Sequence, residues 1–321
     1  MFSGFLYGVG ACLIWGTVYV IPELLSDHSP LWISLLRYAV FGFFCALMLA
    51  VKRRDAARLS RRDWLEAALL GIVGNLFYYW VLSAAVVRIG ASLAAVFSAL
   101  IPLTASLTAC LTDEGRRGNV KRLVLPFVLI SLGLFLLNSE RLELIGTEAA
   151  GVTAAEYAFG LFLAALSVVI WTWFPLANAA WLRRHPGASL TVWTAAQGAA
   201  VLPFAAAGFA AVPILSPGET LLPDWQGIVL ILFLALACSW LGNLLWNRMS
   251  CRLPAVLVGQ MIVFETMSAI LYESLHTGVP PSAEAAFGAF FVLAGVSLSL
   301  LILSGRVPSP IARFFRRPAL H

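Results

Sequence analysis

The sequence predicts an all-α integral membrane protein, with ten transmembrane helices arranged as two inverted repeats of five helices. Three observations predict this class: the composition, the length of the apolar runs, and the side on which the basic residues gather. The 321 residues are 61% hydrophobic and 12% charged, whereas a soluble domain carries about 25% charged residues. A chain of this composition cannot fold as a soluble globule.

The apolar runs have the length that a membrane requires. A hydrocarbon core about 30 Å thick is crossed by roughly 20 helical residues, so runs of that length are transmembrane candidates. Ten such segments follow one another with short connections: 4–24, 31–51, 65–87, 91–112, 120–138, 157–182, 188–211, 226–247, 253–274 and 285–304. We expect a first repeat over 1–140, a periplasmic connection over 141–156, a second repeat over 157–305 and a basic cytoplasmic tail over 306–321.

The segments of the first half each carry a distinguishing feature. The first segment has no basic n-region and exceeds the length of a signal-peptide core, so we expect it to be retained as a helix. Ser29-Pro30 opens the second segment, Gly74-Asn75-Leu76 lies in the third, and Pro102 lies in the fourth. The fifth segment completes a set with an odd number of helices.

The second half repeats two of these features in the same order. Trp171 in the sixth segment corresponds to Trp15 in the first, and Gly242-Asn243-Leu244 in the eighth corresponds to the triplet in the third. The seventh, ninth and tenth segments complete the second set of five. Because five is odd, the second set must enter the membrane from the opposite face, which makes the repeat inverted.

Basic residues indicate the orientation. Of the 21 Lys and Arg residues, 18 follow even-numbered segments, and such loops face the cytoplasm. We therefore expect a multi-pass protein of the bacterial inner membrane with both termini cytoplasmic. This sidedness accounts for the net charge of +5 without a nucleic-acid partner.

Motifs of catalytic and metal sites are missing from the sequence. It contains no GxxxxGK[ST] phosphate loop, no HExxH, no GxSxG and no Cys pair with metal-ligand spacing. We expect no cofactor, no metal and no enzyme activity, so transport would draw on an ion gradient or on the substrate gradient itself.

The spacing of several residues resembles the drug/metabolite transporter superfamily, in particular the EamA-type ten-helix exporters. The residues that carry the resemblance are Trp15-Gly16, Ser29-Pro30, Arg37, Pro102 and Glu114. The resemblance covers nearly the whole chain and implies ten helices in an inverted repeat and export of amino acids, other small metabolites or amphipathic drugs. Glu265 departs from the pattern, because it stands where the family usually has Pro.

Arg37 and Glu265 are the first candidate substrate-binding residues. A charge inside a membrane helix is costly, so Arg37 should face the bundle interior and find a partner. Counted from the outer ends of their helices, both residues lie about 10–12 Å deep at 1.5 Å per residue. We expect them either to form an ion pair, which could serve packing alone, or to bind a zwitterionic substrate. Glu265 is also a candidate to carry a coupled proton.

Aromatic residues and prolines give further candidates. Trp15 and Trp171 lie near the midplane of their helices, where tryptophan is less common than at the interface, so stacking on a substrate competes with core packing as the explanation. Tyr78, Tyr79 and Trp246 extend this aromatic set. Pro22 and Pro175 fall on opposite sides of the membrane within their helices and are candidate gating hinges.

The sequence therefore predicts a secondary transporter, expected to export small amphipathic metabolites such as amino acids by alternating access. Its partners would be the lipid bilayer, a small-molecule substrate and, as a candidate coupling ion, the proton; a monomer and a homodimer both stay open. Efflux of multiple or cationic drugs is the nearest alternative, and a membrane enzyme or lipid-handling protein is the alternative from another class. Substrate, coupling ion and direction are not encoded in any motif that we find.

Overall fold

The computed structural model describes residues 2–101, 103–104, 124–144, 152–253 and 261–303, and every regular element in these ranges is a helix. Those up to residue 144 are α1 (Phe2–Leu24), α2 (Pro30–Val51), α3 (Arg53–Ala56), α4 (Arg61–Gly71), the π-helix η1 (Ile72–Phe77), α5 (Tyr78–Ile89), α6 (Ala91–Ser98) and α8 (Val124–Leu144). The later helices are α9 (Ala154–Arg184), α10 (Leu190–Ala210), α11 (Val212–Leu215), α12 (Trp225–Leu232), the π-helix η4 (Phe233–Gly242), α13 (Asn243–Ser250), α15 (Ile262–Thr277) and α16 (Ala283–Leu303).

The prediction of an all-α chain with long apolar helices is confirmed. Among the described residues, six helices are long and apolar enough to cross a membrane: Phe2–Leu24, Pro30–Val51, Arg61–Ile89, Ala154–Arg184, Leu190–Ala210 and Trp225–Ser250. Four of the ten predicted segments, 91–112, 120–138, 253–274 and 285–304, include residues outside the described ranges. Shorter apolar stretches lie in α8 and α16.

Local sequence explains where several helices begin. Ser29 caps α2 by accepting a hydrogen bond from the backbone N–H of Trp32, and Pro30 occupies the first turn, where its missing N–H costs nothing. Ser60 and Asp63 form a reciprocal capping box at the start of α4. This box begins the helix four residues before the predicted start of the 65–87 segment.

Two long helices are interrupted by π-helical turns, which the sequence did not predict. The helix Arg61–Ile89 contains η1, and Trp225–Ser250 contains η4. The order of elements also recurs: α1, α2, the short α3 and the interrupted α4–η1–α5 are followed later by α9, α10, the short α11 and the interrupted α12–η4–α13.

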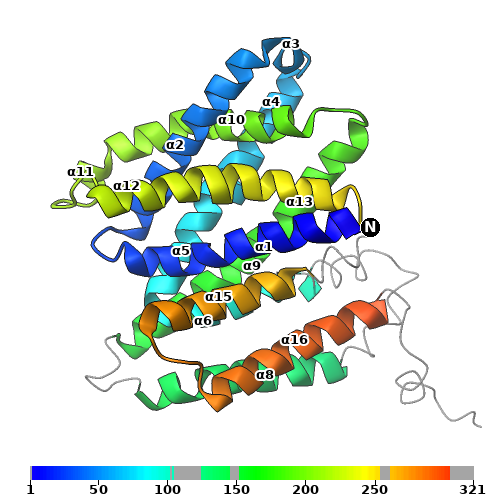
Figure 1. Ribbon diagram of the computed structural model, residues 1–321. Helices are drawn as coiled ribbons and strands as arrows, with labels where there is room; N and C mark the ends of the chain where they lie inside the picture. Colours follow the sequence, from blue (N-terminus) through cyan, green and yellow to red (C-terminus); the bar gives the residue numbers. More distant parts are fainter. Residues whose placement is uncertain (1, 102, 105–123, 145–151, 254–260, 304–321) are drawn as a thin grey trace, which may run out of the picture.

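Helices from the two ends of the chain alternate in space (Figure 1). α2 packs along α10, α5 along α9, and α8 along α16. α1 lies between α13 on one side and α15 on the other. The buried centre of the molecule is therefore built from both halves of the chain, and a side chain on α1, α2 or α5 faces side chains from α9, η4 or α15.

The contact between α2 and α10 depends on glycine. A Cβ atom added to Gly42 would lie 2.7 Å from the carbonyl oxygen of Gly198 and 2.7 Å from the Cβ of Leu202. Small residues allow helices in a membrane to approach closely, because packing rather than the hydrophobic effect drives their association there.

We expect Gly42→Ala to lower the free energy of unfolding by about 1–3 kcal/mol, because the added methyl group meets a backbone that cannot move aside. Thermal unfolding of the purified protein in detergent measures the change. Gly10→Ala is the matched control, since its Cβ would have an ordinary contact of 3.6 Å to Leu245 and alanine favours the helix. Equal effects of the two substitutions would contradict the prediction.

Candidate functional site

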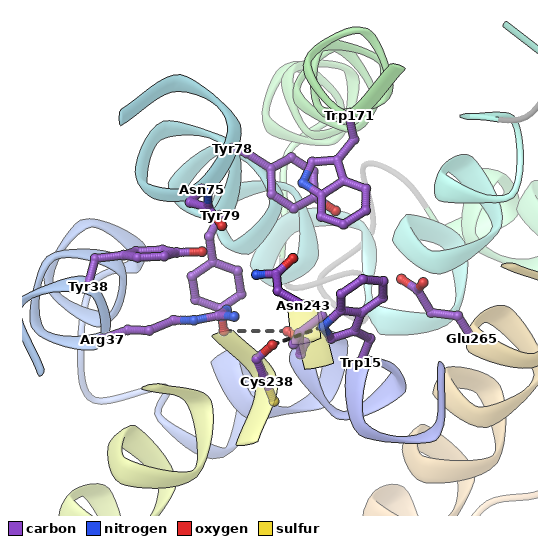
Figure 2. Close-up of a pocket in the computed structure, with 11 residues that line it drawn as sticks. Trp15, Arg37, Tyr38, Asn75, Tyr78, Tyr79, Trp171, Cys238, Asn243 and Glu265 are labelled. Carbon is purple, nitrogen blue, oxygen red and sulfur yellow. Dashed lines mark hydrogen bonds between the residues drawn. The ribbon is translucent and has the colours of Figure 1, made fainter. Parts of the chain in front are cut away.

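A cavity lies at the centre of the bundle, among helices from both halves of the chain (Figure 2). Its walls come from α1, α2, η1, α5, α9, η4, α13 and α15. The lining residues are Trp15, Val18, Arg37, Tyr38, Asn75, Tyr78, Tyr79, Trp171, Cys238, Asn243 and Glu265. Aromatic rings form much of this lining, and one cationic and one acidic side chain interrupt it.

The cavity is small in this conformation. Its volume of about 30 Å³ is about the space of a single water molecule, whereas sites for small ligands span roughly 300–1,000 Å³. In this conformation the centre of the bundle therefore has no room for a small organic ligand.

Arg37 is held against aromatic rings. Its guanidinium carbon lies 4.0 Å from the centroid of the Tyr79 ring and 5.1 Å from that of Tyr38, and its Nε donates to the hydroxyl of Ser239 at 2.9 Å. The residue is 5% exposed, and its Nη1 is buried without a hydrogen-bond partner. A desolvated cation–π contact contributes about 2 kcal/mol, which offsets part of the cost of burying the charge. Nη1 still requires an acceptor.

The two π-helices form the cavity wall beside this arginine. Within η4, the Ser239 hydroxyl accepts the hydrogen bond from Arg37 and donates in turn to the carbonyl of Leu234, five residues earlier. In η1, the Asn75 side chain donates to the carbonyl of Leu70, also five residues earlier. π-Helical turns are frequent at functional sites. Here η1 brings Asn75 to the cavity lining, and η4 brings Ser239 to Arg37.

Trp15 and Trp171 each bond to the backbone of the opposite half. The indole N–H of Trp15 donates to the carbonyl of Cys238 at 2.9 Å, and that of Trp171 donates to the carbonyl of Gly74 at 3.2 Å. The two rings meet edge to face with centroids 5.3 Å apart, a favourable aromatic geometry. Trp171 also packs on Tyr78 at 5.0 Å. The tryptophans therefore join the two halves directly at the cavity.

Glu265 lies across the cavity from Arg37. The Tyr19 hydroxyl donates to its Oε1 at 2.8 Å, and the residue is 8% exposed. Within the described ranges, no basic side chain lies at ion-pair distance from this carboxylate. Figure 2 shows Arg37 and Glu265 on opposite sides, with Trp15 and Asn243 between them. The structure brings the two predicted residues to one cavity but does not pair them.

Three other predicted residues lie outside the lining. Trp246 packs behind Trp15, with ring centroids 5.2 Å apart. Pro22 is buried within α1 and Pro175 lies within α9, and neither contributes to the cavity wall. Any role for these residues acts through the helices that carry the lining.

The sequence reading missed several lining residues. The lining includes Val18, Tyr38, Asn75, Cys238 and Asn243, none of which is among the predicted site residues. The repeated Gly-Asn-Leu triplets were the signal that could have identified the two asparagines. No signal pointed to Tyr38, which follows Arg37 directly and reaches the cavity through the packing of α2.

Comparison with known proteins finds relatives by sequence and by structure. The model of the EamA-like transporter family matches residues 2–139. "Inner membrane protein YtfF" of Escherichia coli (strain K12) is 32% identical over 311 residues, covering 94% of this chain and 95% of that protein. A crystal structure of another protein superposes with a TM-score of 0.62 at 18% identity, over 98% of this chain and 99% of that one; at this identity it supports the fold alone.

We expect Trp15→Phe to lower the free energy of unfolding by about 1–3 kcal/mol, because the buried Cys238 carbonyl loses its indole donor while the ring contacts persist. Thermal unfolding in detergent measures it. Trp240→Phe is the control: the indole nitrogen of Trp240 is buried without a hydrogen-bond partner, so its removal should cost less. The prediction fails if both variants lose the same stability.

Proposed function

The chain belongs to the EamA-like transporter family of the drug/metabolite transporter superfamily, and on that premise we propose that it exports small amphipathic metabolites such as amino acids by alternating access. One observation carries the choice of substrate. Arg37 is buried at an aromatic cavity and keeps one guanidinium nitrogen without an acceptor.

The geometry suits a zwitterion with an apolar body. The substrate carboxylate would accept a hydrogen bond from Nη1 of Arg37, and guanidinium binds carboxylates in a defined planar geometry. An ammonium group would approach Glu265 on the opposite wall, where the carboxylate has a hydroxyl donor in Tyr19 but no cation in the described part of the chain. The rings of Trp15 and Trp171 would contact the apolar portion.

The membrane arrangement follows from the loops and from the relative. The YtfF protein is described as an inner membrane protein, and we assign this chain to the same membrane. Because basic loops tend to face the cytoplasm, we assign both termini to that side. The recurring order of elements supports two inverted five-helix repeats, with the substrate bound where the halves meet.

Export of multiple amphipathic or cationic drugs is the second candidate function, and the aromatic lining favours it. Such a substrate would stack on the rings and approach Glu265, and would not require the charge of Arg37. The charge of Arg37 is therefore required for amino acid export but not for drug export. A membrane enzyme or a lipid-handling protein would need a different polar site.

Transport by the purified protein in liposomes tests the choice. We expect efflux of a zwitterionic amino acid from a substrate panel, and a loss of about tenfold or more in Arg37→Lys, because lysine cannot form the planar two-nitrogen contact. Arg88→Lys is the matched control, since Arg88 donates to Ala84 of its own helix and lies over Phe159, outside the cavity.

Full transport of amino acids by a folded Arg37→Lys protein would reject the zwitterion site. Transport of cationic drugs that is unaffected by the substitution would instead establish the second candidate. Circular dichroism and gel filtration in detergent would show that each variant keeps its fold.

We further expect Glu265→Gln to remove any dependence of flux on an imposed pH gradient, because glutamine cannot carry a proton in either direction. Flux into liposomes at matched and opposed pH gradients measures this. Glu273→Gln is the control on the same helix, since Glu273 accepts from the backbone of Ser92 and lies outside the cavity. A wild-type flux insensitive to pH gradients would exclude proton coupling.

A further inference from the structure

Two contacts between opposite halves of the chain lie at the two ends of the helices around the cavity. One contact centres on Glu219, between α11 and α12, and the other on Asp63, at the start of α4. We propose that these carboxylates are equivalent latches, related by the inverted repeat, and that the transport cycle releases one of them at a time. The proposal rests on the alternating-access function proposed above.

The Glu219 latch joins the connection between α11 and α12 to the connection between α1 and α2. Glu219 accepts from the backbone N–H of Ser29 at 2.6 Å and from its hydroxyl at 2.7 Å. The Nδ1 of His28 lies 3.7 Å from the same carboxylate, and the His28 ring stacks on Trp32 with centroids 3.7 Å apart. Both connections lie together at the left of Figure 1.

The Asp63 latch joins the start of α4 to the end of α9. Asp63 accepts from the indole N–H of Trp181 at 2.8 Å, and the Nε2 of His185 lies 3.3 Å from the same oxygen. The ring of His185 stacks on Trp181, which in turn stacks on Trp193 at 3.5 Å. A second carboxylate one turn along α4, that of Glu66, pairs with Arg184.

The two latches correspond in the order of the elements that carry them. His185 follows His28 by 157 positions, close to the 156 between Trp15 and Trp171, whereas the 156 positions between Asp63 and Glu219 differ from the 168 between Gly74 and Gly242. Each latch combines a histidine after the first long helix of one half with a carboxylate after the second long helix of the other half. An inverted repeat places such equivalent contacts on opposite faces of the membrane.

Distances along the helices place the cavity between the latches. Arg37 lies eight residues, or about 12 Å, from Ser29, and Trp171 lies 14 residues, or about 21 Å, from His185. Both latches are closed in this structure, and the cavity between them holds only about 30 Å³. The geometry is that of an occluded state, from which either end has to open before a metabolite can enter or leave.

Cys238 provides a reporter of opening that needs no substrate. It lines the cavity, and its side chain is buried against Thr17. The parent protein for the test retains Cys238 and carries alanine at Cys12, Cys45, Cys110 and Cys251. A membrane-impermeant maleimide is added to right-side-out and to inverted vesicles, and the rate of labelling is followed in each.

We expect Glu219→Gln to raise labelling about tenfold in right-side-out vesicles only. The two donors of Ser29 bind different carboxylate oxygens, and the amide nitrogen that replaces one of these oxygens cannot accept, so a charge-assisted hydrogen bond is lost. We expect Trp181→Phe to raise labelling by a similar factor in inverted vesicles only, because phenylalanine keeps the ring stack and removes the donor to Asp63. Glu156→Gln is the control, since Glu156 bonds only to Thr153 at the start of its own helix.

Labelling that rises from the same side in both variants, or in neither variant, would overturn the proposal. If a variant fails to fold, His28→Phe and His185→Phe test the same latches with their ring stacks kept. The readout is separate from transport. One-sided labelling without amino acid efflux would retain the latches and reject the substrate, and efflux with unchanged labelling would do the reverse.

Discussion

The buried guanidinium of Arg37 is the constraint on which the centre of this protein depends. A permanent cation in an apolar bundle has to be compensated by its surroundings, and the described residues supply two aromatic faces and one hydroxyl but no carboxylate partner. The compensation is partial, since Nη1 keeps no acceptor. An ion pair within the protein would have compensated the charge of Arg37 fully. Without one, Arg37 can still bind an anionic group, as a substrate-binding site requires.

The π-helical turns explain how the bundle surrounds this charge with polar groups. Ser239 meets Arg37 from within η4, and the carbonyls in or beside the two π-helices receive donors from side chains, those of Trp15, Trp171 and Asn75 among them. An interior carbonyl without a donor is costly in a membrane, so these hydrogen bonds stabilise the fold as well as shape the cavity. Because two of them cross between the halves, a movement of one half relative to the other changes the cavity wall directly.

In the proposed transport cycle, the small cavity and the contacts of Glu219 and Asp63 describe one state. In that state both carboxylates are bonded across the halves. Each contact involves a few hydrogen bonds at the surface of the bundle, and each such bond contributes roughly 1–3 kcal/mol. That is a range in which a bound substrate can shift the balance between states. Stronger latches would hold the protein closed, and absent ones would leave both ends open.

The sequence by itself determined the class of the molecule and the identity of its polar exceptions. Long apolar runs define spanning helices because the bilayer sets their length, and Arg37 and Glu265 were recognisable because a charge within such a run needs a reason. The tertiary structure alone decided that these two residues lie on opposite sides of one cavity without pairing. It also decided that π-helical turns bring Asn75 to the cavity and Ser239 to Arg37, and that His28 and His185 lie near carboxylates far away in the chain. Periodicity and composition report how a segment relates to lipid, and they do not report which segments of opposite halves touch. Those contacts are fixed by the packing of whole helices, where close approaches such as that of Gly42 to Gly198 set the register.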